Sequence, residues 1–140
     1  EGVPFLGICV GMQLMATTGE EHGSHAGLGW LPGRVVPLND RAGEGRAGGL
    51  KVPHMGWNEI EIRRPDHPVV GHIAPGAHAY FVHSYAFVAD DLDMVLAQTD
   101  YGGHISAIVG RNNLLGTQFH PEKSQQTGLR LIHDFLNWQP

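Results

Sequence analysis

Cysteine, lysine and long apolar runs are scarce in this chain. Cys9 is the only cysteine among 140 residues, so no internal disulfide can form, and a reducing, cytoplasmic setting is expected. No apolar run approaches the roughly 18 residues that a membrane-spanning helix needs. Lys and Arg number 9 against 14 Asp and Glu, and the net charge of -5 argues against nucleic acid or an anionic membrane as the main partner.

The length and overall composition of the chain predict a single globular domain over residues 1–140. Hydrophobic residues make up 41% of the chain and charged residues 16%, and a chain of this length can bury a core of its own. Apolar, β-branched and aromatic runs predict strands at 3–8, 34–38, 57–64, 79–88, 93–99, 104–110 and 114–119. Helix formers follow the first run and also end the chain, so an α/β domain with a mixed sheet is expected.

The closing helix has a recognisable start and an apolar stripe. Ser124 precedes it and is the expected N-cap. Leu129, Ile132 and Leu136, with Gln125 one turn earlier, define the face that is expected to be buried.

Two stretches between the strands carry further expectations. "NDRAGEGRAGG" (39–49) is polar and glycine-rich, which predicts a flexible loop. It contains the G-x-G-x-x-G spacing of dinucleotide sites, but "LKVP" rather than a helix follows, so no cofactor is expected. "HPVVGHIA" (67–74) predicts a short helix entered through its proline.

Cys9 stands between two glycines in "GICVG", the form of a nucleophile elbow. Such a nucleophile occupies a strained turn between a strand and a helix, and a β-carbon at either flank, Gly7 or Gly11, is expected to clash. The helix N-terminus predicts a lowered thiol pKa, and the N–H of Val10 would point at a developing oxyanion. The alternative is a buried, inert cysteine, so a partner base is needed to decide.

"QFHPEKS" offers that base. His120 and Glu122 lie two residues apart at the end of a predicted strand, so in extended geometry their side chains leave the same face. A carboxylate beside an imidazole orients the ring and stabilises its protonated form. The alternative is that these residues only begin the last helix, with Glu122 near its positive end. Together with the elbow, the catalytic interpretation is favoured.

Metal binding is the next alternative for the ten histidines. His22 with His25, or His67 with His72, are the nearest candidate ligands. No second cysteine and no tight cluster with Asp or Glu accompanies them, so no metal is expected.

At this point a family resemblance becomes visible. "GICVGMQ" with a downstream "QFHPE" resembles the class I glutamine amidotransferases, whose Cys-His-Glu triad removes ammonia from glutamine. "KVPHMGWN" (51–58), "YFVHSY" (80–85) and "GTQFHPEKSQ" (116–125) are similar to the glutaminase subunits of imidazole glycerol phosphate synthases, in histidine biosynthesis. The resemblance covers essentially the whole chain and implies a flavodoxin-like mixed sheet flanked by helices.

The resemblance also implies roles for individual residues. Cys9 would attack glutamine, His120 would serve as base and acid, Glu122 would orient it, and Val10 would supply an oxyanion donor. The residues implied in binding glutamine are Gln13, Glu21, His83, Ser84 and Tyr85. For Glu21 the alternative is an ordinary solvated carboxylate, and for 83–85 an ordinary core strand.

A partner is implied as well. In this family the ammonia passes to a cyclase subunit with a (β/α)₈ barrel, with which a heterodimer is expected. The residues implied at that junction are Pro53, Met55, Trp57, Asn58 and Lys123. Met55 and Trp57 are apt apolar anchors.

One departure from the family concerns the start of the chain. Family members carry several strands before the elbow, including one that helps form the oxyanion hole, whereas here eight residues precede Cys9. The resemblance therefore implies that the N-terminal strands are missing. Since one lost oxyanion donor costs roughly 100- to 1000-fold in turnover, this chain alone is expected to be weakly active or inactive.

Two functional alternatives stay open. The chain could serve another synthase of the same class, for anthranilate, GMP or CTP, although "PHMGWN" argues against this. It could also be a catalytically inactive fragment that acts as an interaction module.

Overall fold

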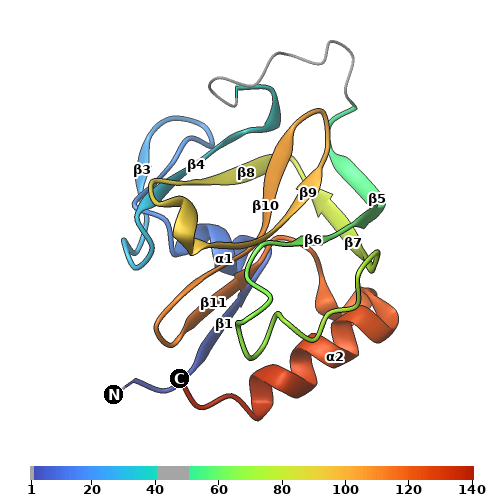
Figure 1. Ribbon diagram of the computed structural model, residues 1–140. Helices are drawn as coiled ribbons and strands as arrows, with labels where there is room; N and C mark the ends of the chain where they lie inside the picture. Colours follow the sequence, from blue (N-terminus) through green and yellow to red (C-terminus); the bar gives the residue numbers. More distant parts are fainter. Residues whose placement is uncertain (1, 41–50) are drawn as a thin grey trace.

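The computed structural model describes residues 2–40 and 51–140, and its described part consists mainly of strands (Figure 1). A five-stranded sheet has the order β1-β11-β10-β9-β6. Its strands are β1 (Phe5–Ile8), β11 (Leu114–Thr117), β10 (His104–Arg111), β9 (Val95–Asp100) and β6 (Glu61–Ile62). β1 and β11 run parallel and the other neighbours antiparallel, so the mixed sheet expected from the sequence is present.

Two smaller sheets complete the strand arrangement. The four-stranded sheet has the order β3-β2-β4-β8, and the two-stranded sheet pairs β5 with β7. Their strands are β2 (Thr18–Gly19), β3 (His25–Ala26), β4 (Gly33–Pro37), β5 (His54–Glu59), β7 (His78–His83) and β8 (Tyr85–Ala89). The single strand predicted over 79–88 is therefore broken at Ser84 into β7 and β8, which pair in different sheets.

The described part has fewer α-helical residues than the sequence predicted. α1 (Val10–Leu14) ends well before Gly19, because the chain at Thr18 already pairs with β4 as β2. The helix predicted over 67–74 is wrong: this segment is a series of turns, with the Gly71 N–H bonded to the His67 carbonyl. The predicted loop at 39–49 lies almost wholly outside the described residues.

The closing helix α2 (Gln125–Leu136) is present, but it buries a different face from the one predicted. Leu129 and Leu136 are 62% and 75% exposed, whereas Gly128 and Leu131 are buried. A β-carbon on Gly128 would lie 1.7 Å from the carbonyl oxygen of Pro121, so only glycine permits this close approach. The approach fixes the rotation of α2 and turns Leu131 into the core.

The cap of α2 also differs from the prediction. Ser124 stands at the N-cap position but makes no side-chain cap hydrogen bond. Its hydroxyl instead donates to the His120 carbonyl at 2.7 Å and accepts from the Tyr80 N–H at 2.9 Å. Ser124 thus ties the end of the His120 segment to β7.

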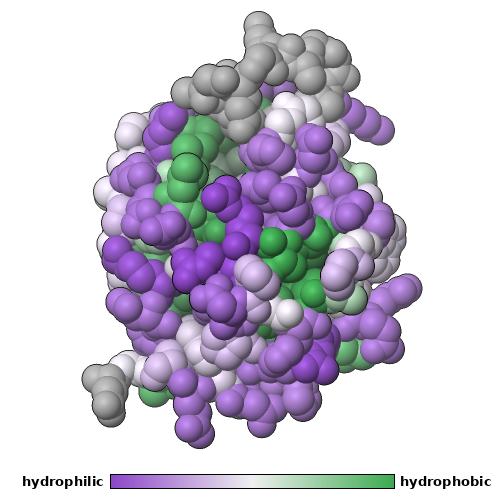
Figure 2. All heavy atoms as spheres, in the orientation of Figure 1, coloured by the Kyte–Doolittle hydropathy of each residue, from purple (hydrophilic) through white to green (hydrophobic). Residues whose placement is uncertain are grey.

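The core lies against the five-stranded sheet. Ile108 and Leu115 of that sheet, Phe81 of β7, Phe119 and Leu131 of α2 belong to one buried cluster. On the face seen in Figure 2 the surface is mainly hydrophilic, with an apolar hollow near β6. A cavity of about 680 Å³ lined by residues of and around β6 lies at this place. No described helix is long and apolar enough to cross a membrane.

Candidate active site

The parallel pair β1 and β11 brings the elbow and the "HPE" segment to the same end of the sheet. Ile8 is the register partner of Thr117, and the N–H of Cys9 donates to the Thr117 carbonyl at 2.7 Å. Cys9 follows β1 directly, and His120 follows β11 after two residues. Parallel neighbours end at one edge, so both segments emerge together.

Strand β7 contacts both segments. The Cys9 thiol donates to the carbonyl of Val82 at 3.9 Å, and the N–H of His120 donates to the carbonyl of Tyr80 at 3.0 Å. Because Tyr80 and Val82 lie two positions apart on one strand, the two segments meet along the same short stretch of β7.

Cys9 has the strained backbone of an elbow. Its φ is 52°, in the left-handed region that non-glycine residues rarely occupy. A β-carbon on Gly7 would lie 2.7 Å from the backbone of Gly11, which confirms the clash predicted at this flank. The clash predicted at Gly11 is wrong, since a β-carbon there meets nothing within 4 Å among the described residues.

The thiol environment overturns the expected direction of its pKa. Burial raises the pKa of the Cys9 thiol, and the negative charge of Glu122 raises it further. The N–H of Val10 and the amide of Gln118 lower it without reversing the shift. Five-residue α1 provides too small a dipole to outweigh desolvation, so the thiol is protonated at neutral pH.

This shift predicts the pH dependence of alkylation. Only the thiolate reacts with iodoacetamide, so a raised pKa means that the native thiol reacts more slowly at neutral pH than the thiol of the unfolded chain. We expect the rate to rise with pH and to reach its midpoint at a higher pH in the native protein than in denaturant. Mass spectrometry of timed samples measures this, and a lower native midpoint would contradict the assignment.

His120 and Glu122 are hydrogen-bonded to each other. His120 Nδ1 lies 2.6 Å from Glu122 Oε1, with the imidazole 20% and the carboxylate 50% exposed. A carboxylate only accepts, so Nδ1 carries the proton and the neutral ring presents a lone pair at Nε2. This segment forms a single 3₁₀ turn at Pro121–Lys123, before α2. The extended geometry predicted for this segment is therefore wrong, but Glu122 still contacts His120 and does not serve only the helix terminus.

Three predicted site residues line one cavity beside the elbow. Val10, Gln13 and Glu21 surround a space of about 210 Å³ that is closed on another side by β2, β3 and β4. The Gln13 amide is held on its inner side by the Tyr85 carbonyl at 3.3 Å and by the Gln118 side-chain oxygen at 3.1 Å. The cavity can thus offer a carboxylate and an amide to a small ligand.

The predicted binding segment 83–85 meets this site through backbone rather than through side chains. The His83 ring is buried against His54 of β5, and His83 Nδ1 donates to the Tyr85 carbonyl at 2.7 Å. Ser84 links β7 to β8, and its carbonyl accepts from the N–H of Leu38. Tyr85 contributes its carbonyl to Gln13.

The residues predicted at a partner junction divide between the two faces of β5. Met55 and Trp57 are 62% and 49% exposed. Trp57 meets the edge of Tyr80 at a ring distance of 5.9 Å, and Lys123 Nζ lies 6.0 Å from the Tyr80 ring centre. These residues therefore form one exposed group.

Asn58 and Pro53 lie outside this exposed group. Asn58 points to the opposite face of β5, where it donates to the Asp100 carbonyl at 2.8 Å. Side chains alternate along a strand, so Asn58 and Met55 cannot share a face. Pro53 precedes β5 and is half-buried.

Gln118 is a site residue that the sequence interpretation missed. It is fully buried, and its amide donates to Cys9 Sγ at 3.7 Å while its oxygen accepts from Gln13. The available signal was a polar residue at the buried end of an apolar strand, immediately before the "FHPE" segment.

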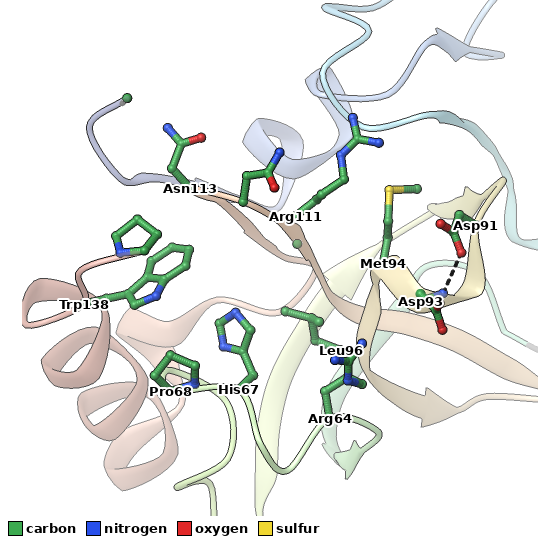
Figure 3. A pocket seen from close by; sticks show the side chains of 14 residues that line it. Arg64, His67, Pro68, Asp91, Asp93, Met94, Leu96, Arg111, Asn113 and Trp138 are labelled. Atoms are coloured by element: carbon green, nitrogen blue, oxygen red, sulfur yellow. Dashed lines mark hydrogen bonds between the residues drawn. The ribbon is translucent and has the colours of Figure 1, made fainter.

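A larger cavity lies at the opposite end of β1 and β11. It encloses about 610 Å³ and is lined by Arg64, His67, Arg111, Asn113 and Trp138, among others (Figure 3). None of the predicted site residues lines it. Among the residues that the structure describes, no group of three or more His, Cys, Asp or Glu is placed to hold a metal.

Comparisons with known proteins show the family to which the chain belongs. The chain matches the family model described as glutamine amidotransferase class-I over residues 1–138. It is 53% identical over 139 residues to the imidazole glycerol phosphate synthase subunit HisH of Rhodospirillum rubrum, covering 98% of this chain. It is 57% identical over 138 residues to the protein of the same name in Cereibacter sphaeroides, again covering 98%. The chain spans about 62% of the length of these curated relatives.

Solved structures confirm the fold class. A glutamine amidotransferase crystal structure aligns with a TM-score of 0.64 at 20% identity, over 96% of this chain and 59% of that one. Another, from Thermotoga maritima, aligns with a TM-score of 0.59 at 19% identity, over 96% and 47%. With the family model matching nearly its whole length, this chain belongs to the class I glutamine amidotransferases.

Proposed function

We propose that the protein hydrolyses glutamine to glutamate and ammonia with Cys9 as nucleophile. The proposal is supported by one arrangement: the strained Cys9 elbow and the hydrogen-bonded His120–Glu122 pair both follow strands of the parallel pair β1 and β11, and both segments contact β7. A strained nucleophile beside an oriented imidazole is the arrangement that acyl transfer requires.

In the first half-reaction, His120 Nε2 takes the thiol proton and Cys9 Sγ attacks the carboxamide carbon. Because burial keeps the thiol protonated at neutral pH, the attack requires this base. The Val10 N–H, which already lies against the sulfur, donates to the oxygen that becomes negative. The C–N bond then breaks, and ammonia leaves with the proton that His120 returns.

In the second half-reaction, water attacks the thioester. His120 Nε2 takes a proton from the water, the C–S bond breaks, and the sulfur regains a proton as glutamate leaves. Glu122 holds the ring through its bond to Nδ1 in both steps. The cavity at Val10, Gln13 and Glu21 seats the substrate, and the Glu21 carboxylate suits its ammonium group.

We propose further that the ammonia is delivered to a (β/α)₈-barrel cyclase subunit in histidine biosynthesis. The support is the name of the relatives, which are synthase subunits, and the exposed group of Met55, Trp57 and Lys123 beside the site. In bulk water ammonia becomes mainly ammonium and loses its nucleophilicity, so a consuming enzyme has to dock directly. Exposed Met and Trp side chains are suitable anchors for such docking.

Labelling with the glutamine-analogue diazoketone diazo-oxo-norleucine tests the glutaminase. The Cys9 sulfur forms a thioether with the diazo carbon, N₂ leaves, and the thiol proton ends on that carbon. We expect modification at Cys9 alone, competition by glutamine, and none in Cys9→Ala, as read by peptide mass spectrometry.

The alternative outcomes are equally specific. A folded protein whose Cys9 resists the analogue but reacts with iodoacetamide would favour an inactive interaction module. Stimulation of glutamine hydrolysis by the barrel cyclase with its nucleotide substrate supports the proposed partner, whereas stimulation only by an anthranilate, GMP or CTP synthase subunit would reassign it.

A further inference from the structure

Three buried polar side chains near the site have no role in the proposed reaction. His54, His83 and Gln118 are 4%, 6% and 0% exposed. Polar groups are costly to bury unless they are hydrogen-bonded, so such groups are usually kept in one fixed arrangement. Together with Gln13 they form a line of hydrogen bonds that runs from β5 to the Cys9 thiol.

The Tyr85 carbonyl sets the direction of the two hydrogen bonds at the centre of this line. Tyr85 begins β8, the last strand of its four-stranded sheet, and its carbonyl accepts from two side chains. His83 Nδ1 lies at 2.7 Å and Gln13 Nε2 at 3.3 Å. A carbonyl oxygen only accepts, so both nitrogens must be donors.

The positions of the protons on the two histidine rings follow from their hydrogen bonds toward β5. Because His83 Nδ1 carries a proton, its neutral ring accepts at Nε2, and His54 Nδ1 donates to it at 2.9 Å. His54 Nε2 then accepts from Asn58 Nδ2 at 3.3 Å. The Asn58 amide is oriented independently, since its oxygen accepts from the Glu59 N–H and its nitrogen donates to the Asp100 carbonyl. All these contacts are satisfied when both histidine rings are neutral and carry their proton on Nδ1.

Aromatic packing holds the outer histidine in this orientation. The His54 ring stacks on Tyr101 at 4.0 Å and 20° and on Phe81 at 4.8 Å and 21°. Two nearly parallel neighbours restrict rotation of the ring, so its Nδ1 stays directed at His83.

From the Tyr85 carbonyl, a second series of hydrogen bonds runs through Gln13 and Gln118 to the Cys9 sulfur. The Gln13 amide nitrogen also donates to Gln118 Oε1 at 3.1 Å, which leaves Gln118 Nε2 to face the sulfur. That nitrogen donates to Cys9 Sγ at 3.7 Å. An N–H directed at sulfur favours the thiolate, which the reaction has to form in a half-buried position.

We propose that His54, His83 and Gln118 are positioning residues of the glutaminase site. His54 orients the His83 ring, and His83 holds the Tyr85 carbonyl in place. This carbonyl holds the Gln13 amide at the substrate cavity. Gln118, which accepts from Gln13, directs its own N–H at the Cys9 sulfur. The inference rests on the proposed glutaminase function and adds three residues: His54 and His83 act through others, and Gln118 contacts the Cys9 sulfur directly.

A matched pair of substitutions at His83 separates positioning from mere packing. His83→Asn keeps a donor where Nδ1 stands and loses the bond to His54, whereas His83→Gln keeps the bond to His54 and loses the donor to Tyr85. Because the Tyr85 carbonyl then loses the shorter of its two hydrogen bonds, it no longer holds the Gln13 amide in one position, and we expect His83→Gln to raise the half-saturating concentration of diazo-oxo-norleucine about tenfold or more. His83→Asn should raise it by only about threefold, since it keeps the donor to Tyr85 and loses only the orienting bond from His54, and iodoacetamide alkylation should change little in either variant.

Gln118→Glu tests the other end of the line. It keeps the side-chain shape but replaces the N–H at the sulfur with a carboxylate oxygen. We expect the rates with both diazo-oxo-norleucine and iodoacetamide to fall about tenfold or more, since the thiolate loses a donor and gains a negative neighbour.

Nitrogen NMR of the histidine rings in the wild-type protein provides a readout that needs neither activity nor a variant. We expect His54 and His83 both neutral with the proton on Nδ1. An Nε2 proton on His83, or equal effects of the two His83 substitutions in a protein that the analogue does label, would overturn this inference alone. A wild-type protein that the analogue fails to label would instead overturn the proposed function on which it rests.

Discussion

Replacing Cys9 by serine is expected to lower glutamine hydrolysis by at least about 10⁴-fold, because the serine hydroxyl is a far weaker nucleophile in the same position. His120→Asn should cost about as much, since the buried thiol of Cys9 stays protonated without its base. The measurement is glutamate formation from glutamine in the presence of the proposed barrel partner.

The double substitution distinguishes one catalytic unit from two independent residues. If Cys9 and His120 act together, Cys9→Ser with His120→Asn should be no slower than the slower single variant. Glu122→Gln is the graded control, with an expected loss of about 10- to 100-fold, because an amide oxygen can still accept from His120 Nδ1. Multiplicative losses in the double variant would show that the two residues are not coupled.

Replacing Gly7 by alanine is expected to destabilise the fold by about 2–4 kcal/mol. The new β-carbon would lie 2.7 Å from the carbonyl carbon and oxygen of Gly11 and 2.8 Å from the amide nitrogen of Met12. These are backbone atoms at the start of α1, and α1 itself packs on β11, so neither neighbour can yield without moving the elbow.

Gly11→Ala is the matched control on the other side of the cysteine. A β-carbon there meets nothing within 4 Å among the described residues, and alanine favours a helix over glycine by up to about 1 kcal/mol. We expect an unchanged or slightly higher free energy of unfolding, measured with urea for both variants. Equal destabilisation by the two substitutions would contradict the packing at Gly7.

The reactive residues of the site could be predicted because each motif that identifies them spans only a few neighbouring residues. Two glycines around Cys9 indicated a strained turn, and the i, i+2 spacing brought His120 and Glu122 together as predicted, although through a 3₁₀ turn at Pro121–Lys123 rather than through extended backbone. The antiparallel hairpin of β10 and β11, with Asn112 at a positive φ of 55° in its turn, follows from the same kind of local signal.

The predictions for α2 were wrong where its local sequence is compatible with two different packing arrangements. The apolar residues of α2 permit a face with Leu129 and Leu136 as well as one with Leu131, and the contact of Gly128 with Pro121 selects the second. Ser124 could cap α2, but its hydroxyl instead accepts from the N–H of Tyr80 and donates to the carbonyl of His120. Distant segments decided both cases.

The sequence by itself determined which side chains carry the chemistry, Cys9, His120 and Glu122, because residue type and spacing act through bond geometry alone. Only the tertiary structure decided how these groups behave: the raised pKa of the Cys9 thiol, the burial of Gln118 against it, and the orientation of the His54–His83 pair. Burial and hydrogen-bond direction depend on segments 29 to 109 positions apart that meet only after the sheets have paired. No short stretch of sequence contains that information.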